Sequence, residues 1–331
     1  MSSSIQITGL TASSKTPGAV GQMRRARGKS NPDAAAKVLC LLGNKTSAGS
    51  LVADAKPVQV FSEEEAIAAG GARGEVTQMA LAALAYGIAP FMGAVTEAGG
   101  GAAGTWTLTF ANGNAGTAGT IYFIVGHPDH GVLSIPINIP AGSTPTASAV
   151  IAKTAINTAA LGRLPYTADN SSGVLTITSA NVGVRANQYI AHLDNTTSPP
   201  TTQTSALTGG TALSDGGIPM TGGSGQDTLT AILANMLADQ YEYQAIAAND
   251  ATSVDAALDQ IDAKDHPLVG MTEFLVVGLN GTQAAAITFG SSSMNHALGQ
   301  LVFLKSCMTH PSVIAASMAA KRATTEGTNR N

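Results

Sequence analysis

Two histidines flank a carboxylate in the segment His127-Pro-Asp-His130, and imidazole and carboxylate groups are common zinc ligands. A metal site needs three or four ligands that converge on one point. Pro128 lies inside this segment and a glycine follows it, a combination that is typical of a hairpin turn. We therefore interpret the segment as a turn and predict no metal ligands in the chain.

Glycine-rich segments are a second group of candidates, because glycine-rich loops hold calcium or phosphate in some folds. Residues 222–230, with the sequence GGSGQDTLT, match the calcium-binding nonapeptide of parallel β-helices. A single copy cannot share ligands with stacked repeats, so we predict instead that Asp227 or Thr228 caps a following helix. The runs at 99–104 and 209–225 lack the strand-to-helix context and the lysine of a phosphate-binding loop, which indicates linkers.

Nucleophilic side chains are the third group. The segment Gly290-Ser-Ser-Ser-Met294 is rich in serine, but a nucleophile elbow needs a glycine two residues after the serine. Cys40 and Cys307 each lie in an apolar run, which favours reduced, buried thiols. The remaining histidines form no recognisable group with carboxylates. We therefore predict no catalytic, cofactor-binding or metal-binding residue, no cofactor, and a protein that is not an enzyme.

The composition points to a protein that works through contacts. Of 331 residues, 44% are hydrophobic and only 11% are charged, against a usual share of about a quarter. Such a surface suits a subunit whose exterior becomes interface. The net charge of −4 argues against nucleic-acid binding by the whole chain. We find no secretory signal and no apolar run of about 18 residues, so we expect a protein made in the cytoplasm and not inserted in a membrane.

The elements at both ends of the chain alternate between strands and helices. The continuous apolar run at 36–42 predicts a strand buried on both faces of a parallel sheet. Ser62 with Glu65 forms a capping-box pattern that begins a helix. Further strands are predicted at 57–61, 89–95, 243–248, 274–278 and 300–304, helices at 62–70, 75–86, 227–239, 253–264 and 311–322, and short helical turns at 284–287 and 294–296. This alternation predicts an open α/β sandwich.

The middle of the chain is rich in β-strands. In the segment 133–139 every second residue is a large aliphatic, which predicts a strand with one buried face. Ser143 or Thr144 then caps a helix with Pro145 in its first turn, and this helix is expected to end at Gly162. At helical spacing along it lie Ala147, Val150, Ile151 and Ala155. A loop through residue 173 follows, and other strands are expected at 106–110, 121–125, 174–178 and 188–193.

These patterns predict an α/β fold whose core is assembled from N- and C-terminal segments around an inserted β-rich (α+β) domain. The predicted parts are an extended N-terminal arm at 1–33, the first part of the core at 34–97, the insertion at 98–222, the second part of the core at 223–323 and a polar tail at 324–331. The arm carries the basic run Met23–Lys29, either a solvated charge cluster or a contact for an acidic partner.

The order of several segments resembles a known family, the contractile-tail sheath proteins of Mu-like bacteriophages within the myovirus tail sheath family. The pattern IAKTAINTAALGRLPYTADNSSGVLTITSANV at 151–182 is the most specific, because it resembles the helix and hairpin of that family's insertion. The other matching segments are Thr16-Pro-Gly, 36–46, 57–62, 74–89, 227–249 and 309–322. Family members usually continue beyond the counterpart of Arg322, whereas this sequence ends at Asn331, as a short variant or a shortened form.

The resemblance implies a structural role. Subunits of that family form stacked sixfold rings around a tail tube, and contraction drives the tube through the host envelope. The implied partners are other copies of the chain, the tail tube protein, and the baseplate and tail terminator proteins, with no nucleic acid. The implied location is the virion tail, after assembly in the host cytoplasm. A terminal arm would add an edge strand to the sheet of a neighbouring subunit.

A second hypothesis from another class stays open. The β-rich insertion could instead be a binding module for a receptor or glycan on a virion or secretion device. Such a module needs exposed aromatic rings, and the candidates are Trp106, Tyr122 and Tyr166. Trp106 alternates with threonines along its strand, which favours a place in the core. A binding module would form discrete oligomers, whereas a sheath subunit would form large ordered assemblies.

Overall fold

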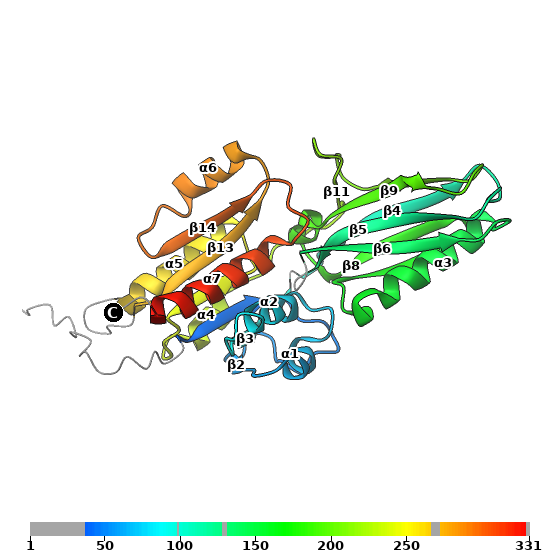
Figure 1. Cartoon of the computed structure of the whole chain (residues 1–331). Coiled ribbons are helices and arrows are strands. Elements are labelled where there is room, and N and C mark those ends of the chain that lie inside the picture. Colours follow the sequence, from blue (N-terminus) through cyan, green and yellow to red (C-terminus); the bar gives the residue numbers. More distant parts are fainter. Residues whose placement is uncertain (1–36, 98, 128–130, 266–271, 329–331) are drawn as a thin grey trace, which may run out of the picture.

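The computed structural model describes residues 37–97, 99–127, 131–265 and 272–328. The predicted arm at 1–33 therefore lies outside the described residues. Figure 1 shows an elongated molecule with a mixed unit at one end and a β-rich unit at the other. The predicted domain limits stay a prediction. For description, we call residues 37–97 and 223–328 the α/β unit and residues 99–222 the β-rich unit.

A six-stranded sheet with the order β14-β13-β12-β1-β3-β2 forms the centre of the α/β unit. β2 runs antiparallel to β3, and every other neighbouring pair is parallel. The strands are β1 (Leu39–Gly43), β2 (Val58–Gln59), β3 (Phe91–Ala94), β12 (Tyr243–Ile246), β13 (Phe274–Asn280) and β14 (Gly299–Leu304). The predicted buried parallel strand is confirmed as β1, which lies inside the sheet between β12 and β3.

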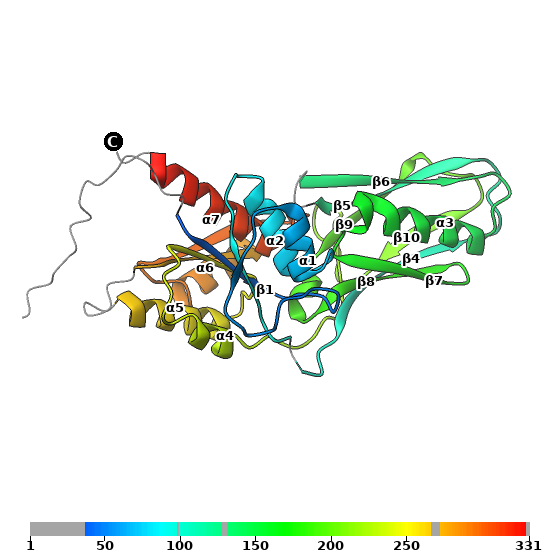
Figure 2. The same cartoon turned by 90° about the horizontal axis from the view of Figure 1, so that it is seen from below.

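Helices cover both faces of this sheet, as Figure 2 shows. Leu39 and Leu41 of β1 face the core beneath α1, α2 and α7, whereas Cys40 and Leu42 face the core beneath α4 and α5. The helices are α1 (Glu63–Gly70), α2 (Glu75–Leu84), α4 (Thr230–Asn235), α5 (Ala251–Asp265), α6 (Gln283–Ser292) and α7 (Pro311–Thr328). The predicted α/β class is confirmed. Within the described ranges, every helix is too short or too polar to span a lipid bilayer.

The β-rich unit contains two four-stranded antiparallel sheets, with the orders β10-β4-β8-β7 and β11-β9-β5-β6, and the helix α3 (Pro145–Thr158). The strands are β4 (Ala103–Ala111), β5 (Gly119–His127), β6 (Gly131–Ile139), β7 (Tyr166–Ser171), β8 (Val174–Val182), β9 (Ile190–Ser198), β10 (Thr204–Thr208) and β11 (Ile218–Pro219). Trp106 lies at the centre of the core and packs edge-to-face on Phe123 and Tyr166, at centroid distances of 5.8 and 5.4 Å.

Two of the three predicted helix caps are present. Ser62 Oγ accepts a hydrogen bond from the Glu65 amide at 3.2 Å, as the capping box requires. The Glu65 carboxylate accepts from the Phe61 amide at 2.7 Å, one residue before the usual partner. Of the two candidates for α3, Thr144 is the cap, and its hydroxyl accepts from the Ala147 amide at 3.2 Å.

The fully buried residues of α3 are Ser148, Ala149, Ala152 and Ile156. Of the four residues noted at helical spacing, Ile151 and Ala155 pack against the same core, whereas Ala147 and Val150 are exposed. The Ser148 hydroxyl donates to the Gln203 side chain at 2.7 Å, and both side chains are buried. This polar contact and two alanines let the helix lie close to the strands, while the larger Val150 is 46% exposed.

The segment after α3 was also predicted incorrectly. α3 ends at Thr158, before a 3₁₀ turn at Ala159–Gly162, and Tyr166–Ser171 is the strand β7 where a loop was expected. β7 pairs with β8 through the two-residue turn at 172–173. The Asn157 side chain bonds both the amide and the carbonyl of Ala168 at 2.8 Å, so tertiary contacts override the turn-forming sequence.

Several further expectations in the second half of the chain need correction. α4 covers only Thr230–Asn235 of the predicted helix at 227–239, while α6 is a full helix at the predicted short turn, and 294–296 is not helical. α7 continues to Thr328, into the predicted polar tail. Cys40 is fully buried, but Cys307 is only half-buried, because it lies in the connection between β14 and α7. The strands β10 and β11 were not predicted.

Candidate functional site: the joint between the two units

The sheet of the α/β unit has a topological switch point between β1 and β12. From β1 the chain continues towards β3 and β2, whereas from β12 it continues towards β13 and β14 on the other side. In open α/β sheets, ligands bind in the crevice outside the carboxyl ends of the strands at such a point. Here the short helix η2 (Val184–Gln188) of the β-rich unit lies there, and the side chains of Gln188 and Asn249 hydrogen-bond to each other.

Arg185 is the central residue of this joint. Its Nη2 donates to Glu75 Oε2 at 2.7 Å, and its Nε lies 3.2 Å from Glu75 Oε1. Nη2 also contacts a carboxylate oxygen of Asp227. All three side chains are buried, with at most 8% of any side chain exposed. Because Asp227 serves Arg185, it does not cap α4, and this explains why the predicted cap is absent.

The two carboxylates differ in their electrostatics. Burial works to raise the pKa of Glu75, but Arg185 and His310 outweigh it and hold this pKa below its usual value. Glu75 is also the first residue of α2, where the helix dipole favours a negative charge. For Asp227, burial is the largest influence and raises the pKa despite the contact with Arg185. One guanidinium therefore stabilises two carboxylates unequally.

His310 connects the joint to the start of α7. Its Nε2 lies 3.2 Å from the Arg185 carbonyl oxygen, and its Nδ1 lies 2.7 Å from Ser312 Oγ. The ring packs on Tyr189 with centroids 4.3 Å apart, and Nδ1 is 3.8 Å from Glu75 Oε1. A neutral ring with hydrogen on Nε2 satisfies both bonds, because Nε2 then donates and Nδ1 accepts. Burial lowers the pKa of His310, which favours this neutral form.

Acid should therefore weaken the protein through His310. In the unfolded chain the His310 ring has its ordinary pKa near 6.5, whereas in the folded chain this pKa is lower. The free energy of unfolding therefore decreases as the pH is lowered from 6.5 towards the pKa of the folded state. The slope is at most about 1.4 kcal/mol per pH unit. Glu75 acts in the same direction below pH 4.5, and Asp227 opposes it. We expect urea unfolding at a series of pH values to show a shallower slope below pH 6.5 in His310→Gln than in the wild type; equal slopes would exclude His310 as the source.

Further hydrogen bonds join the units around Arg185. The Asn181 side chain accepts from the Glu75 amide at 3.1 Å and donates to the Lys45 carbonyl and to Glu97 Oε1, both at 3.0 Å. The predicted linkers before and after the β-rich unit pair with each other through isolated bridges. These bridges are Thr96–Thr228, Ala102–Ser224 and Thr105–Thr221. The segment at 222–230 thus lies beside the outgoing chain, and its aspartate serves the ion cluster.

A second set of contacts lies beside α1 and α2. Arg73 donates from Nε to the Gly162 carbonyl at 2.8 Å and from Nη1 to the Tyr166 carbonyl at 2.9 Å. Gln78 donates to the Arg163 carbonyl at 3.0 Å, and Arg163 forms an ion pair with Glu63. The β-rich unit is therefore fixed to the α/β unit at two places on α2 and the segment before it.

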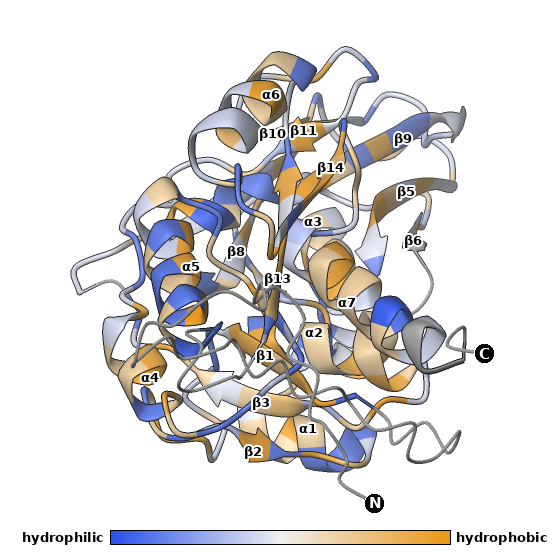
Figure 3. Ribbon diagram, turned by 90° about the vertical axis from the view of Figure 1, so that its left-hand side faces the viewer, coloured by the Kyte–Doolittle hydropathy of each residue, from blue (hydrophilic) through white to orange (hydrophobic). Residues whose placement is uncertain are grey.

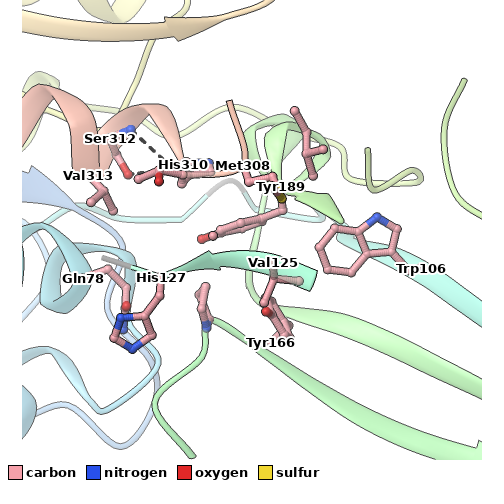
Figure 4. Close-up of a pocket in the computed structure, with 14 residues that line it drawn as sticks. Gln78, Trp106, Val125, His127, Tyr166, Tyr189, Met308, His310, Ser312 and Val313 are labelled. Carbon is pink, nitrogen blue, oxygen red and sulfur yellow. Dashed lines mark hydrogen bonds between the residues drawn. The ribbon is translucent and has the colours of Figure 1, made fainter. Parts of the chain in front are cut away.

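A small cavity lies between these contacts (Figure 4). Its volume is about 20 Å³, roughly the room that one water molecule occupies. Sites for organic ligands usually have at least about 300 Å³. The cavity is lined by Gln78, Trp106, Val125, Gly126, His127, Pro165, Tyr166, Tyr189, Ile190, Met308, Thr309, His310, Ser312 and Val313. The joint is thus packed too closely to admit a substrate of ordinary size at this place.

Comparisons with known proteins give a distant likeness among solved structures. No family model matches the sequence, and no curated protein matches it. Among solved structures, the chain is similar to the sheath tail protein from Desulfitobacterium hafniense, with a TM-score of 0.35 and 15% sequence identity. The aligned region covers 89% of this chain and 60% of that structure, so the chain spans less than two thirds of its length.

Several residues that the sequence offered as candidates for a site are buried inside the protein. His127 is buried at the end of β5 beside the cavity, whereas His130 lies outside the described residues. No group of three or more histidine, cysteine, aspartate or glutamate side chains in the described part of the chain is placed to hold a metal ion. Trp106 and Tyr166 are 1% and 2% exposed, and Tyr122 is half-buried. Two of the three aromatic candidates for glycan binding are therefore core residues.

Arg185 is the functional residue that sequence reasoning missed. It is one of three basic residues between positions 98 and 222, with Lys153 and Arg163 as the others. An arginine in a segment with so few charged residues is the signal that could have indicated a buried ion pair, because a buried charge needs a partner of opposite charge. Its partners were not predictable, because Glu75 and Asp227 are 110 and 42 residues away.

Gly126 marks a place where the units touch by their backbones. A Cβ atom added at Gly126 would lie 2.2 Å from the Met308 carbonyl oxygen. We expect Gly126→Ala to destabilise the protein by about 1–3 kcal/mol, because the connection to α7 would have to move. Gly281→Ala is the matched control, since a Cβ there meets nothing within 4 Å. Chemical denaturation of both variants measures the difference, and equal midpoints would contradict a rigid contact at Gly126.

Proposed function

We propose that the chain is a structural subunit of the tail-sheath type, which polymerises as stacked sixfold rings around a tail tube and contracts to drive that tube through a host envelope. The observation that carries the proposal is the closed switch-point crevice. Where other doubly wound sheets hold a ligand, this one holds the ion cluster of Arg185, Glu75 and Asp227. The sheet therefore supports a second unit in place of a substrate.

The joint fits a subunit that moves as a rigid body. Lattice rearrangements act by rotating packed bodies against one another, which requires that each body keep its own shape. The hydrogen bonds of Arg73, Gln78, Asn181 and Arg185 link the two units at separate points. A low content of charged residues agrees with a surface used for contacts with copies of the chain. The order of sequence segments that resemble the sheath family gives the proposal its specific form.

The proposal includes the partners and location of such a subunit. It places the chain in a virion tail, in contact with other copies, a tail tube protein, and baseplate and terminator proteins. It assigns the chain no catalysis, no cofactor and no nucleic-acid ligand. The β-rich unit would face outward, since an insertion rich in glycine and threonine tolerates exposure, and the α/β unit would face the tube.

Negative-stain electron microscopy of the purified chain, without any ligand, tests this function. We expect hollow cylinders or stacked rings. A chain that stays as small discrete oligomers at high concentration, and that binds immobilised glycans in the same preparation, would contradict the sheath function and favour a binding module. Arg185→Met is a useful companion sample, because a loosened joint should give irregular or shorter assemblies.

A further inference from the structure

The two ends of the six-stranded sheet carry exposed apolar side chains. Figure 3 shows α6 beside the β14 end and α1 beside the β2 end, at opposite extremes of the α/β unit. At the β14 end, Ile287 is 62% exposed and Leu304 is 39% exposed. At the β2 end, Val58 is 53% exposed and Phe61 is 65% exposed. Apolar groups gathered on a surface mark interaction sites, and an open strand edge strengthens that reading.

The first surface consists of α6 and the outer edge of β14, and we call it the α6/β14 patch. α6 has the uncharged sequence QAAAITFGSS, yet only Ala286 of this helix is buried. In β14, Leu301 and Val302 pack against the cores on opposite faces of the sheet and, like Phe303, are only partly exposed. The charged residue that follows β14 is Lys305, which is also exposed. The patch is therefore apolar with a positive charge at its margin.

The second surface consists of Val52, β2 and the start of α1, and we call it the β2/α1 patch. Val52 is 70% exposed, and the next residue, Ala53, forms a bridge to β3, the strand with which Val58 also pairs. The first turn of α1 carries three consecutive carboxylates; Glu63 pairs with Arg163 and Glu65 accepts from the Phe61 amide, so the exposed Glu64 is the acidic group at this margin. The nearby Lys56 is already engaged by Asp239 at 2.8 Å. This patch is therefore apolar with a negative margin.

We propose that these two patches bind each other between copies of the chain, with the α6/β14 patch of one subunit seated against the β2/α1 patch of the next. The occupant is a second copy because one chain carries both complementary surfaces, apolar against apolar and Lys305 against Glu64 of α1. Since the patches differ and lie at opposite ends of the sheet, the contact is head-to-tail, which generates rings or helical arrays. The inference deepens the proposed sheath function and rests on it for its biological meaning.

A symmetric contact is less favourable at either end. Two α6/β14 patches would bring Lys305 towards Lys305, and two β2/α1 patches would bring carboxylates together. β2 has only two residues, so a ladder of backbone hydrogen bonds across the contact would be short. Packing of Ile287 and Leu304 against Val58 and Phe61 is therefore the main attraction in the proposed contact.

Two substitutions test this polarity by mixing. Phe61→Glu damages only the β2/α1 patch, and Ile287→Glu damages only the α6/β14 patch. We expect each variant alone to lose self-association by about tenfold or more, as central apolar contacts usually do when replaced. An equimolar mixture should recover a one-to-one pair, because each variant keeps one intact patch that fits the other. Analytical ultracentrifugation of labelled variants measures the pair directly.

Val132→Glu is the matched control, since Val132 is 51% exposed on β6 of the β-rich unit and belongs to neither patch. It should associate like the wild type. Circular dichroism and denaturation midpoints of all three variants establish that they are folded, because exposed positions tolerate such changes. A variant that failed this test would be replaced by Phe61→Ser or Ile287→Ser, with the same expected pairing.

Several results would overturn the inference. The inference fails if the wild-type protein stays monomeric at high concentration. It also fails if either variant alone associates as strongly as the wild type, or if the mixture of the two variants forms no pairs. Association retained by Phe61→Glu and lost by Ile287→Glu would show a symmetric α6/β14 contact. The sheath function is judged separately. Cylinders formed by both variants would keep that function and exclude this contact, whereas pairs in the mixture without any wild-type cylinders would keep the contact and exclude the sheath.

Discussion

Replacing Arg185 by methionine will destabilise the protein by about 3–5 kcal/mol, since removal of one member of a buried ion cluster leaves uncompensated charge. Glu75 and Asp227 would lose their cation while 3% and 6% exposed. The loss is expected to be largest at neutral pH, where both carboxylates are ionised. It should diminish in acid as the raised pKa of Asp227 lets that group become protonated. Urea or guanidinium unfolding at several pH values measures both the size and the direction of the effect.

The matched control combines Arg185→Met with Glu75→Gln and Asp227→Asn. Removing all three charges together should recover much of the loss, because buried ion clusters replaced as a whole are often nearly neutral in stability. Lys153→Met is a second control, since its ion pair with Asp169 lies on the surface and should leave the unfolding midpoint almost unchanged. A triple variant as unstable as Arg185→Met would show that packing of the guanidinium, and not its charge, stabilises the joint.

The parts of the fold that sequence predicts well are those with strong local periodicity. Residues 133–139 alternate, and the structure buries Ile135, Ile137 and Ile139 on one face of β6. The run at 36–42 has no alternation because β1 faces helices on both sides, as the packing of Leu41 and Leu42 into opposite cores shows. In these segments the hydropathy pattern is enough to predict which residues are buried.

Prediction fails where contacts outside a segment decide its conformation. β7 contains Asp169, Asn170 and Ser171, which favour turns, yet its pairing with β8 makes it a strand. Asp227 is a good helix cap by type, but the buried guanidinium of Arg185 takes its carboxylate. For α6 only a short helical turn at 284–287 was predicted, whereas the structure has the ten-residue helix Gln283–Ser292 at the open end of the sheet. Such outcomes depend on contacts outside the segment itself.

The same reasoning applies to the candidate site. Sequence reasoning interpreted the motif at Gly222–Thr230 as the start of a helix and not as a calcium site, and in the structure its aspartate contacts the Arg185 side chain. It could not locate the joint, because the joint brings together α2, η2 and the start of α7, which are more than 100 residues apart. Sequence motifs consist of neighbouring residues, whereas the buried charges of this chain come from segments that are far apart in the sequence.

Trp106→Ala is expected to destabilise the β-rich unit by about 3–5 kcal/mol, because it removes a large side chain from the middle of a closed core. Trp106 is 1% exposed, and it also donates a hydrogen bond from Nε1 to the Ile218 carbonyl at 2.8 Å. This bond holds the segment around β11 against the sheet that contains β4. Trp106→Phe separates the two contributions, since it keeps most of the apolar volume but loses the donor, which should cost about 1–2 kcal/mol.

The Trp106 series also discriminates between the two functions considered for the β-rich unit. Tyr122→Ala changes a half-buried ring on the outer face of β5 and should cost less stability than Trp106→Ala. If the unit is a structural part of a subunit, the assembly of these variants should follow their stability in order, with Trp106→Ala the most impaired. If the unit binds a glycan through its exposed ring, Tyr122→Ala should abolish that binding while its denaturation midpoint stays close to wild type. Glycan binding lost in Tyr122→Ala, together with assembly unaffected by Trp106→Ala, would contradict the structural role.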